Sequence, residues 1–232
     1  MPIILGQLVL AAIIGYLWGS IPAGYWMGKL LRGKDFDIRD YGSRKIGATN
    51  VLRTLGKGPA AIVFVFDLSK GVGPTLVALL VPFLHVFGWG PAIAGVMALL
   101  GHCYPIFIGF KGGRGVLTGG GALLVISPLI FLISIIMTAL TIATTRYVSL
   151  GSIVGALSSI ICGLIFFFVG LANPNFFVHV TLADLFYLIV APAIVIILHY
   201  DNIGRLLSGT ERKIGQKVQL EDKPASNTSP SV

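Results

Sequence analysis

The chain has 232 residues, of which 55% are hydrophobic and only 11% are charged. A soluble domain usually carries about 25% charged residues, so this composition excludes a water-soluble globule and indicates an integral membrane protein. The formal net charge of +8 does not predict nucleic-acid binding, because basic residues also orient proteins in membranes.

Apolar segments lie at about 3–29, 58–82, 88–108, 115–144, 149–172 and 182–199. They are continuous rather than alternating, which favours helices over a β-barrel. The first has no basic stretch before it and is interpreted as a retained span, not a cleaved signal peptide. The fourth would be about 45 Å long as one helix, against a hydrocarbon core of about 30 Å. Because Ser127-Pro128 interrupts it, it is either one strongly tilted helix or two elements joined by a turn.

The distribution of basic residues decides between these alternatives. They are dense in 32–57, recur at 109–114, at Arg146 and in the C-terminal region, and are absent near 83–87 and 172–181. All basic connections lie on one face of the membrane only if the segment 115–144 crosses the membrane twice. The sequence therefore predicts an all-α polytopic membrane protein with seven transmembrane helices, one short or re-entrant, the N-terminus outside and the C-terminus cytoplasmic. We expect residues 1–213 to form a single domain and 214–232 to form a disordered tail.

Three polar, glycine-rich stretches then share the cytoplasmic face: 41–60, 101–121 and 198–213. Glycines let backbone amides approach an anion, hydroxyl groups donate to it, and arginine can bind it bidentately. The run KGGRG at 111–115 resembles a phosphate-binding helix N-terminus but lacks the spacing of a P-loop. Single basic residues at a membrane edge are usually anchors or topology signals. The combination of three such stretches predicts a site for one or more phosphates.

Two ionisable residues lie inside an apolar segment. Asp67 and Lys70 are three positions apart, so they share a helix face. They form either an internal ion pair or a direct contact with a ligand, and the sequence leaves both open. Cys103 and Cys162 lie in separate apolar segments and are interpreted as buried thiols, with neither a disulfide nor a metal site.

His179 and Asp184 match the HxxxxD pattern of many glycerolipid acyltransferases. They lie beside a connection without lysine or arginine, which the charge distribution places far from the basic face. We therefore reject this match as the site.

Six sequence blocks together resemble a known family. They are GSIPAGY (19–25), GSRKIGATNVLRTLGKGPA (42–60), FDLSKG (66–71), GHCYPIFIGFKGGRGV (101–116), RYVSLGSI (146–153) and HYDNIGRLLSGTE (199–211). This set resembles the PlsY-type bacterial acyl-phosphate:glycerol-3-phosphate acyltransferases, in family order over about residues 15–213. The resemblance implies a multi-pass enzyme of the bacterial inner membrane whose active site faces the cytoplasm. It would transfer a fatty acyl group from acyl phosphate to the sn-1 hydroxyl of glycerol 3-phosphate, giving lysophosphatidic acid without a metal or cofactor.

The resemblance also implies roles for individual residues. It assigns catalysis to Ser43, Arg53 and His199. It assigns binding of substrate or phosphate to Gly42, Gly47, Thr49, Asn50, Lys111, Gly112, Gly113, Arg114, Ser149 and Asn202. Two positions depart from the family pattern, because Lys45 replaces the usual asparagine and Arg114 the usual lysine. A further implied partner is the enzyme that makes acyl phosphate from acyl-carrier protein.

The implied reaction suits the residues present. An acyl phosphate has a good leaving group, so the protein needs no covalent nucleophile and has only to position the hydroxyl and stabilise charge. The base is either His199 or an oxygen of the donor's phosphate, and the family favours the second. The main alternative is a small-anion transporter with the same cations along a phosphate pathway, which would need polar groups reaching the other face. A structural membrane protein would leave the three anion-suited stretches unexplained.

Overall fold

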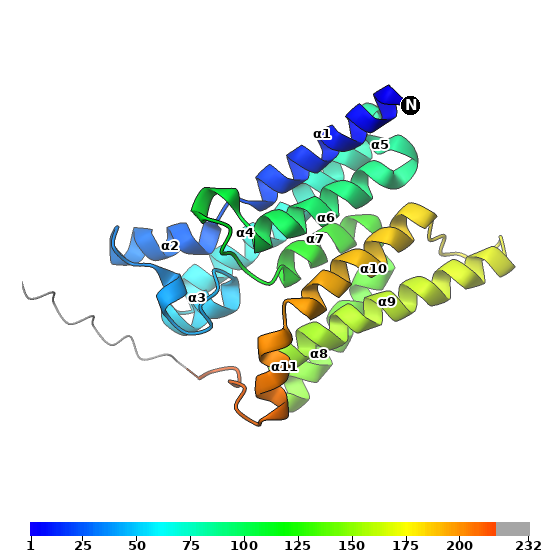
Figure 1. The fold of residues 1–232 in the computed structure, drawn as a ribbon. Helices are drawn as coiled ribbons and strands as arrows, with labels where there is room; N and C mark the ends of the chain where they lie inside the picture. Colours follow the sequence, from blue (N-terminus) through cyan, green and yellow to red (C-terminus); the bar gives the residue numbers. More distant parts are fainter. Residues whose placement is uncertain (217–232) are drawn as a thin grey trace, which may run out of the picture.

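The computed structural model describes residues 1–216, and every regular element in this range is a helix (Figure 1). The α-helices are α1 (Pro2–Gly19), α2 (Ala23–Arg32), α3 (Ala48–Thr54), α4 (Lys57–Leu80), α5 (Pro82–His85), α6 (Trp89–Cys103), α7 (Val116–Ile126), α8 (Pro128–Thr145), α9 (Val148–Ala172), α10 (Leu182–Ile197) and α11 (Tyr200–Leu207). Short 3-10 helices lie at Ile38–Asp40, Val86–Gly88 and Ile106–Ile108. The predicted disordered tail falls, from residue 217 onward, outside the described residues.

Several helices are long and apolar enough to cross a membrane. Among residues 1–216 there are 5 such segments, Pro2–Arg32, Lys57–Leu80, Pro82–Ile108, Pro128–Thr145 and Val148–Ala172. Helices α10 and α11, which are bent by 56° relative to one another, make a sixth if they form one span. The predicted break within 115–144 is confirmed, because α7 ends at Ile126 and α8 begins at Pro128. Proline has no N–H to continue a helix but fits the first turn of a new one.

Small residues allow the helices to pack closely. Gly15 and Gly19 of α1 lie against the backbone of Ala94 and Ala98 of α6, where a Cβ atom on either glycine would overlap a carbonyl oxygen. Gly71 of α4 meets the carbonyl oxygen of Thr118 on α7 in the same way. In a membrane, where lipid is as apolar as the protein, such close backbone contacts are a main source of helix association.

Large apolar side chains cover much of the outer surface. Leu132, Ile136 and Phe168 are 52%, 48% and 61% exposed, as expected of side chains that face lipid. Both cysteines are free. Cys103 is buried as predicted, but the prediction was wrong for Cys162, which is partly exposed on α9.

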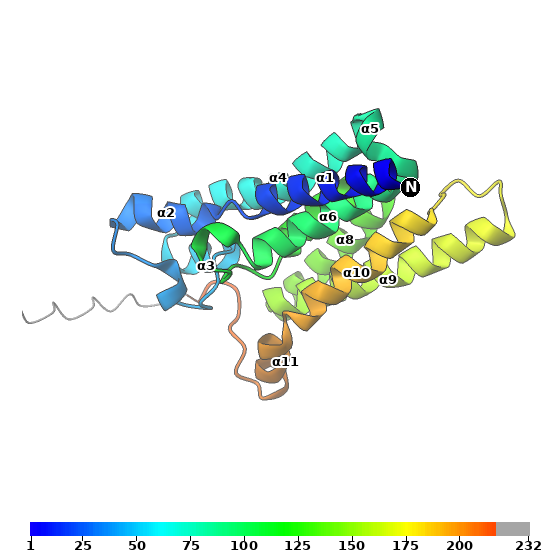
Figure 2. The same cartoon turned by 45° about the horizontal axis from the view of Figure 1, so that its top comes forward.

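The two ends of the bundle differ in chemistry. Helices α2, α3 and α11 lie toward one end, whereas the N-terminus, α5 and the α9–α10 connection lie toward the other (Figures 1 and 2). The connection between α6 and α7 also lies toward the α2–α3 end (Figure 1). The three glycine-rich stretches therefore gather at one end of the bundle, as the distribution of charge predicted.

Candidate active site

A cavity of about 480 Å³ opens between α4 and α7 on one side and α8, α9 and α10 on the other. Its polar part, toward α3 and α11, is lined by Ser43, Lys45, Gly47, Thr49, Asn50, Arg53, Arg114, Ser149, His199, Asn202 and Glu211. Its apolar part runs among side chains that include Leu68, Leu117, Leu123, Phe131, Ile135 and Val195. We call the polar part, which carries several cations, the mouth of the cavity, and the apolar part its chamber.

Most of the predicted site residues meet in this mouth. Nine of the thirteen line it, and they come from α3, α9, α11 and the connections before α3, α7 and α11. Four are not in the lining: Gly42, Lys111, Gly112 and Gly113. Lys45, which departs from the family pattern, also lies in the lining and adds a further cation.

Asn50 organises the connection before α3. Its side chain is buried, and Nδ2 donates to the carbonyl oxygens of Ile38, Tyr41 and Lys45 at 3.2, 3.1 and 2.8 Å. Its Oδ1 accepts a hydrogen bond from the backbone N–H of Ser43 at 2.9 Å. The Asn50 side chain is therefore engaged within the protein, and it holds the backbone that carries Ser43.

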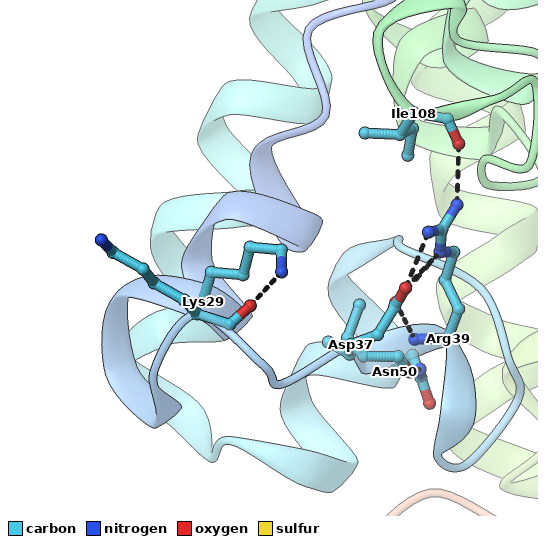
Figure 3. A network of polar contacts seen from close by, with 7 residues as sticks. Lys29, Asp37, Arg39, Asn50 and Ile108 are labelled. Atoms are coloured by element: carbon cyan, nitrogen blue, oxygen red, sulfur yellow. Dashed lines mark hydrogen bonds and ion pairs between the residues drawn. The ribbon is translucent and has the colours of Figure 1, made fainter.

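A second network ties this connection to the segment before α7 (Figure 3). Arg39 pairs with Asp37 at 2.7 Å, and its Nη1 donates to the carbonyl oxygen of Ile108 at 2.8 Å. Burial raises the pKa of Asp37, but hydrogen bonds and the charge of Arg39 outweigh burial and hold this pKa below its usual value. In the same view Lys29 donates to the backbone of Lys34.

The glycines before Arg114 serve packing instead of presenting free amides. The N–H of Gly112 donates to the carbonyl oxygen of Cys103, and that of Gly113 to the carbonyl oxygen of His102, both at 3.1 Å. These two amides are thus not free for a phosphate, contrary to the sequence interpretation. Lys111 is exposed outside the cavity, whereas Arg114 reaches into it.

Two arginines and a histidine face the mouth. Arg53 on α3 makes a long hydrogen bond of 3.5 Å to the carbonyl oxygen of Arg212. Burial lowers the pKa of both Arg53 and Arg114. The ring of His199 is buried, with Nδ1 2.7 Å from the carbonyl oxygen of Val195. Because a carbonyl can only accept, Nδ1 carries the proton, and Nε2 of the neutral ring is left with a lone pair.

Glu211 is a site residue that the sequence analysis did not assign. Oε1 accepts from Ser149 Oγ at 2.8 Å and from Asn202 Nδ2 at 2.7 Å, and Oε2 accepts from Arg205 Nε at 2.7 Å. Burial raises the pKa of Glu211, but these hydrogen bonds and the charge of Arg205 together lower it below the usual value. The sequence feature that could have indicated Glu211 is its place as a lone carboxylate between Arg205 and Arg212.

The mouth has an excess of positive charge. Arg205 and Arg212 lower the pKa of Arg53, whereas Glu211 raises it, which shows that these charges lie within reach of one another. Several guanidinium groups therefore share one neighbouring carboxylate, and a buried site of this kind attracts anions. Within residues 1–216, no group of three His, Cys, Asp or Glu side chains is placed to hold a metal ion.

The fold and the cavity define a helical membrane protein in which a site with the charge to bind anions opens into an apolar chamber. A family model described as "Glycerol-3-phosphate acyltransferase" matches residues 9–209, and the chain belongs to this family. The relative from Thermoanaerobacter sp., named glycerol-3-phosphate acyltransferase, is 41% identical over 92% of this chain and 98% of its own length. The relative of the same name from Streptococcus gordonii is 41% identical over 91% of this chain and 95% of its own length.

Solved structures agree with this assignment. Two are forms of PlsY, an integral membrane glycerol 3-phosphate acyltransferase, and each is 37% identical over 90% of this chain and 96% of its own length. The glycerol 3-phosphate form has a TM-score of 0.76 and the lysophosphatidic acid form one of 0.73. The chain is therefore an integral membrane acyltransferase.

Proposed function

We propose that the protein transfers a fatty acyl group from acyl phosphate to the sn-1 hydroxyl of glycerol 3-phosphate, forming lysophosphatidic acid and releasing phosphate. The observation that carries this proposal is the cavity that joins a mouth lined by Arg53 and Arg114 to an apolar chamber. An acyl phosphate has the same two parts, an anionic head and an apolar chain. Family membership removes the support for an anion transporter.

The proposed orientation is that of seven crossings, with the N-terminus outside and the mouth in the cytoplasm of a bacterial inner membrane. It is supported by the basic connections gathered at the α2–α3 end and by the positive-inside rule. Helix α7, with 11 residues, would be the short crossing. Residues 1–213 would form one catalytic domain, and the enzyme that makes acyl phosphate would supply the donor at the same face.

In the proposed mechanism, the hydroxyl oxygen of glycerol 3-phosphate attacks the acyl carbon and the bond from that carbon to the phosphate oxygen breaks. Arg53 and Arg114 bind the phosphates and stabilise the charge on the leaving group. The Ser43 hydroxyl and Asn202 Oδ1, which is buried without a partner among the described residues, hold the substrate in line. The hydroxyl proton passes to His199 Nε2 or to an oxygen of the donor's phosphate, so that phosphate leaves as the second product.

A comparison of donors tests the proposed function. Purified protein in detergent would receive glycerol 3-phosphate with palmitoyl phosphate, palmitoyl-CoA or palmitoyl-carrier protein, and lysophosphatidic acid would be measured. We expect product from palmitoyl phosphate alone, with one phosphate released per product. Product from the thioesters but not from the phosphate would contradict the proposed donor, and no product from a folded protein would contradict the function.

Replacing His179 by alanine is expected to change kcat/KM less than twofold. His179 is exposed in the α9–α10 connection, and Asp184 forms a capping box with Thr181 at the start of α10. The HxxxxD pattern here is thus a helix cap at the end of the bundle opposite the mouth. Loss of turnover in the same acyl phosphate assay would restore this pattern as the active site.

Gly120 is expected to influence acyl-chain preference. It lines the chamber, and a Cβ atom there would be 3.7 Å from Phe131, so packing does not demand glycine. Replacement by leucine would fill part of the chamber, and each lost methylene contact is worth about 1 kcal/mol. The ratio of kcat/KM for dodecanoyl over palmitoyl phosphate should rise at least tenfold. Gly6→Leu, at an exposed position of α1 with nothing within 4 Å, is the matched control and should leave the ratio unchanged.

A further inference from the structure

Three buried ionisable side chains beneath the mouth have no role in the proposed mechanism. Lys70 Nζ pairs with Asp67 Oδ1 at 2.6 Å, and His102 Nδ1 lies 3.6 Å from the same oxygen. Their side chains are between 2% and 4% exposed. The internal ion pair that the sequence left open is therefore present, and it includes a histidine from α6 that the sequence did not connect to it.

This cluster lies against the segment that carries Arg114. The backbone N–H of Gly113 donates to the carbonyl oxygen of His102, and a Cβ atom on Gly113 would overlap His102 Nε2. The segment thus rests directly on the imidazole ring. On the other side of Arg114, the buried hydroxyl of Thr118 donates to the carbonyl oxygen of Asp67 at 2.9 Å.

Within the described part of the chain, no side chain forms a hydrogen bond or an ion pair with the guanidinium group of Arg114. Its Nε is buried without a hydrogen-bond partner among the described residues, and the guanidinium lines the cavity. Its position is therefore set by the main chain, which is bonded at Gly113 and Thr118 to the backbone carbonyl oxygens of His102 and Asp67 and packs at Gly113 against the His102 ring. A cation without a partner in the protein is free to bind an anion. It binds in a defined geometry when the backbone that carries it is fixed.

The ion pair places a carboxylate oxygen beside one edge of the His102 ring, 3.6 Å from Nδ1, which has no hydrogen-bond partner among the described residues. Lys70 neutralises and holds Asp67, and the carboxylate faces Nδ1 of His102 while the opposite ring nitrogen meets Gly113. Asp67 and His102 also line the cavity, so they lie directly below the mouth. A charged pair is costly within a membrane bundle, which makes it a poor choice for packing alone.

We propose that Asp67, Lys70 and His102 are positioning residues that hold Arg114 in place for substrate phosphate. The inference rests on the proposed function, since it assumes that Arg114 binds a phosphate. If the inference is right, the three residues affect phosphate binding through Arg114 and not through the other cations of the mouth.

A double-mutant cycle tests this dependence, with the affinity for glycerol 3-phosphate and for inorganic phosphate measured by calorimetry. We expect Arg114→Ala to weaken binding of glycerol 3-phosphate about 10-fold and His102→Gln, which preserves volume, about 3- to 10-fold. In the Arg114→Ala background, His102→Gln should add less than a twofold effect. In the Arg53→Ala background it should keep its full effect, which a general loss of structure would not reproduce.

Two further variants keep the test open if the histidine variants fail to fold. Gly113→Ala pushes the segment off the ring. Asp67→Asn keeps the shape but removes the charge that faces Lys70 and His102. Both should weaken phosphate binding when Arg114 is present and add little when Arg114 is alanine. Additive effects in the Arg114→Ala background would overturn the inference. If Arg114→Ala itself binds both anions as wild type does, the phosphate role of Arg114 in the proposed function fails instead.

Discussion

Replacing Arg53 by alanine is expected to lower kcat/KM at least 100-fold and to leave the thermal unfolding transition almost unchanged. The side chain is half-buried at the mouth, and among residues 1–216 its one hydrogen bond is the 3.5 Å contact with the backbone of Arg212. Little folding energy therefore depends on it. A preorganised charge aimed at a developing anion in a water-poor site is worth about 2.7–4 kcal/mol of transition-state stabilisation.

Two comparison variants make this result specific. Arg53→Lys should recover part of the activity, because lysine restores the charge but not the planar pair of donors. Arg32→Ala removes the same charge from an exposed position at the end of α2 and should retain full activity. If Arg53→Ala retains more than a tenth of wild-type kcat/KM with palmitoyl phosphate, the mouth is not the phosphate site.

The sequence predicted the gross architecture because its determinants are local or additive. Hydropathy over about 20 residues identifies spans. Ser127-Pro128 breaks a helix by its own covalent geometry, and α8 begins at this proline. The distribution of basic residues then places the glycine-rich stretches together, as they are in the structure.

The sequence did not predict which groups in those stretches remain free. The amides of Gly112 and Gly113 are used by the end of α6, and the amide of Asn50 by three carbonyl groups. Glycine and asparagine suit both anion binding and tight backbone packing, so residue type alone does not separate these uses. Only the three-dimensional hydrogen-bond partners do.

Glu211 was missed for a related reason. Its partner Ser149 is 62 residues earlier in the chain, on α9, and no helical spacing connects the two. From sequence a carboxylate after the last helix looks like an ordinary surface charge. In the fold its side chain is only 5% exposed and joins α9 to α11.

Replacing Glu211 by alanine is expected to lower both activity and stability. Ser149, Asn202 and Arg205 would each lose an acceptor, and the first two donors are buried. Because Arg205 is 40% exposed, solvent compensates part of the loss at that pair. We expect a stability loss of about 2–4 kcal/mol. We also expect at least a 100-fold loss of kcat/KM, since Ser149 and Asn202 line the mouth. Asp35→Asn, at an exposed position of the same end, should change neither.

The pH dependence of stability separates the charge of Glu211 from its shape. Its pKa in the folded protein lies below the ordinary value of 4.5, so its stabilising contribution is full above pH 4.5 and declines as the pH falls through the lowered pKa. Glu211→Gln keeps the volume and one acceptor but has no charge. The difference in melting temperature between wild type and Glu211→Gln should therefore be constant from pH 7 to pH 5 and shrink below pH 4.5. A difference that stays the same at low pH would show that Glu211 contributes by shape and hydrogen bonding alone, and that the mouth does not depend on its charge.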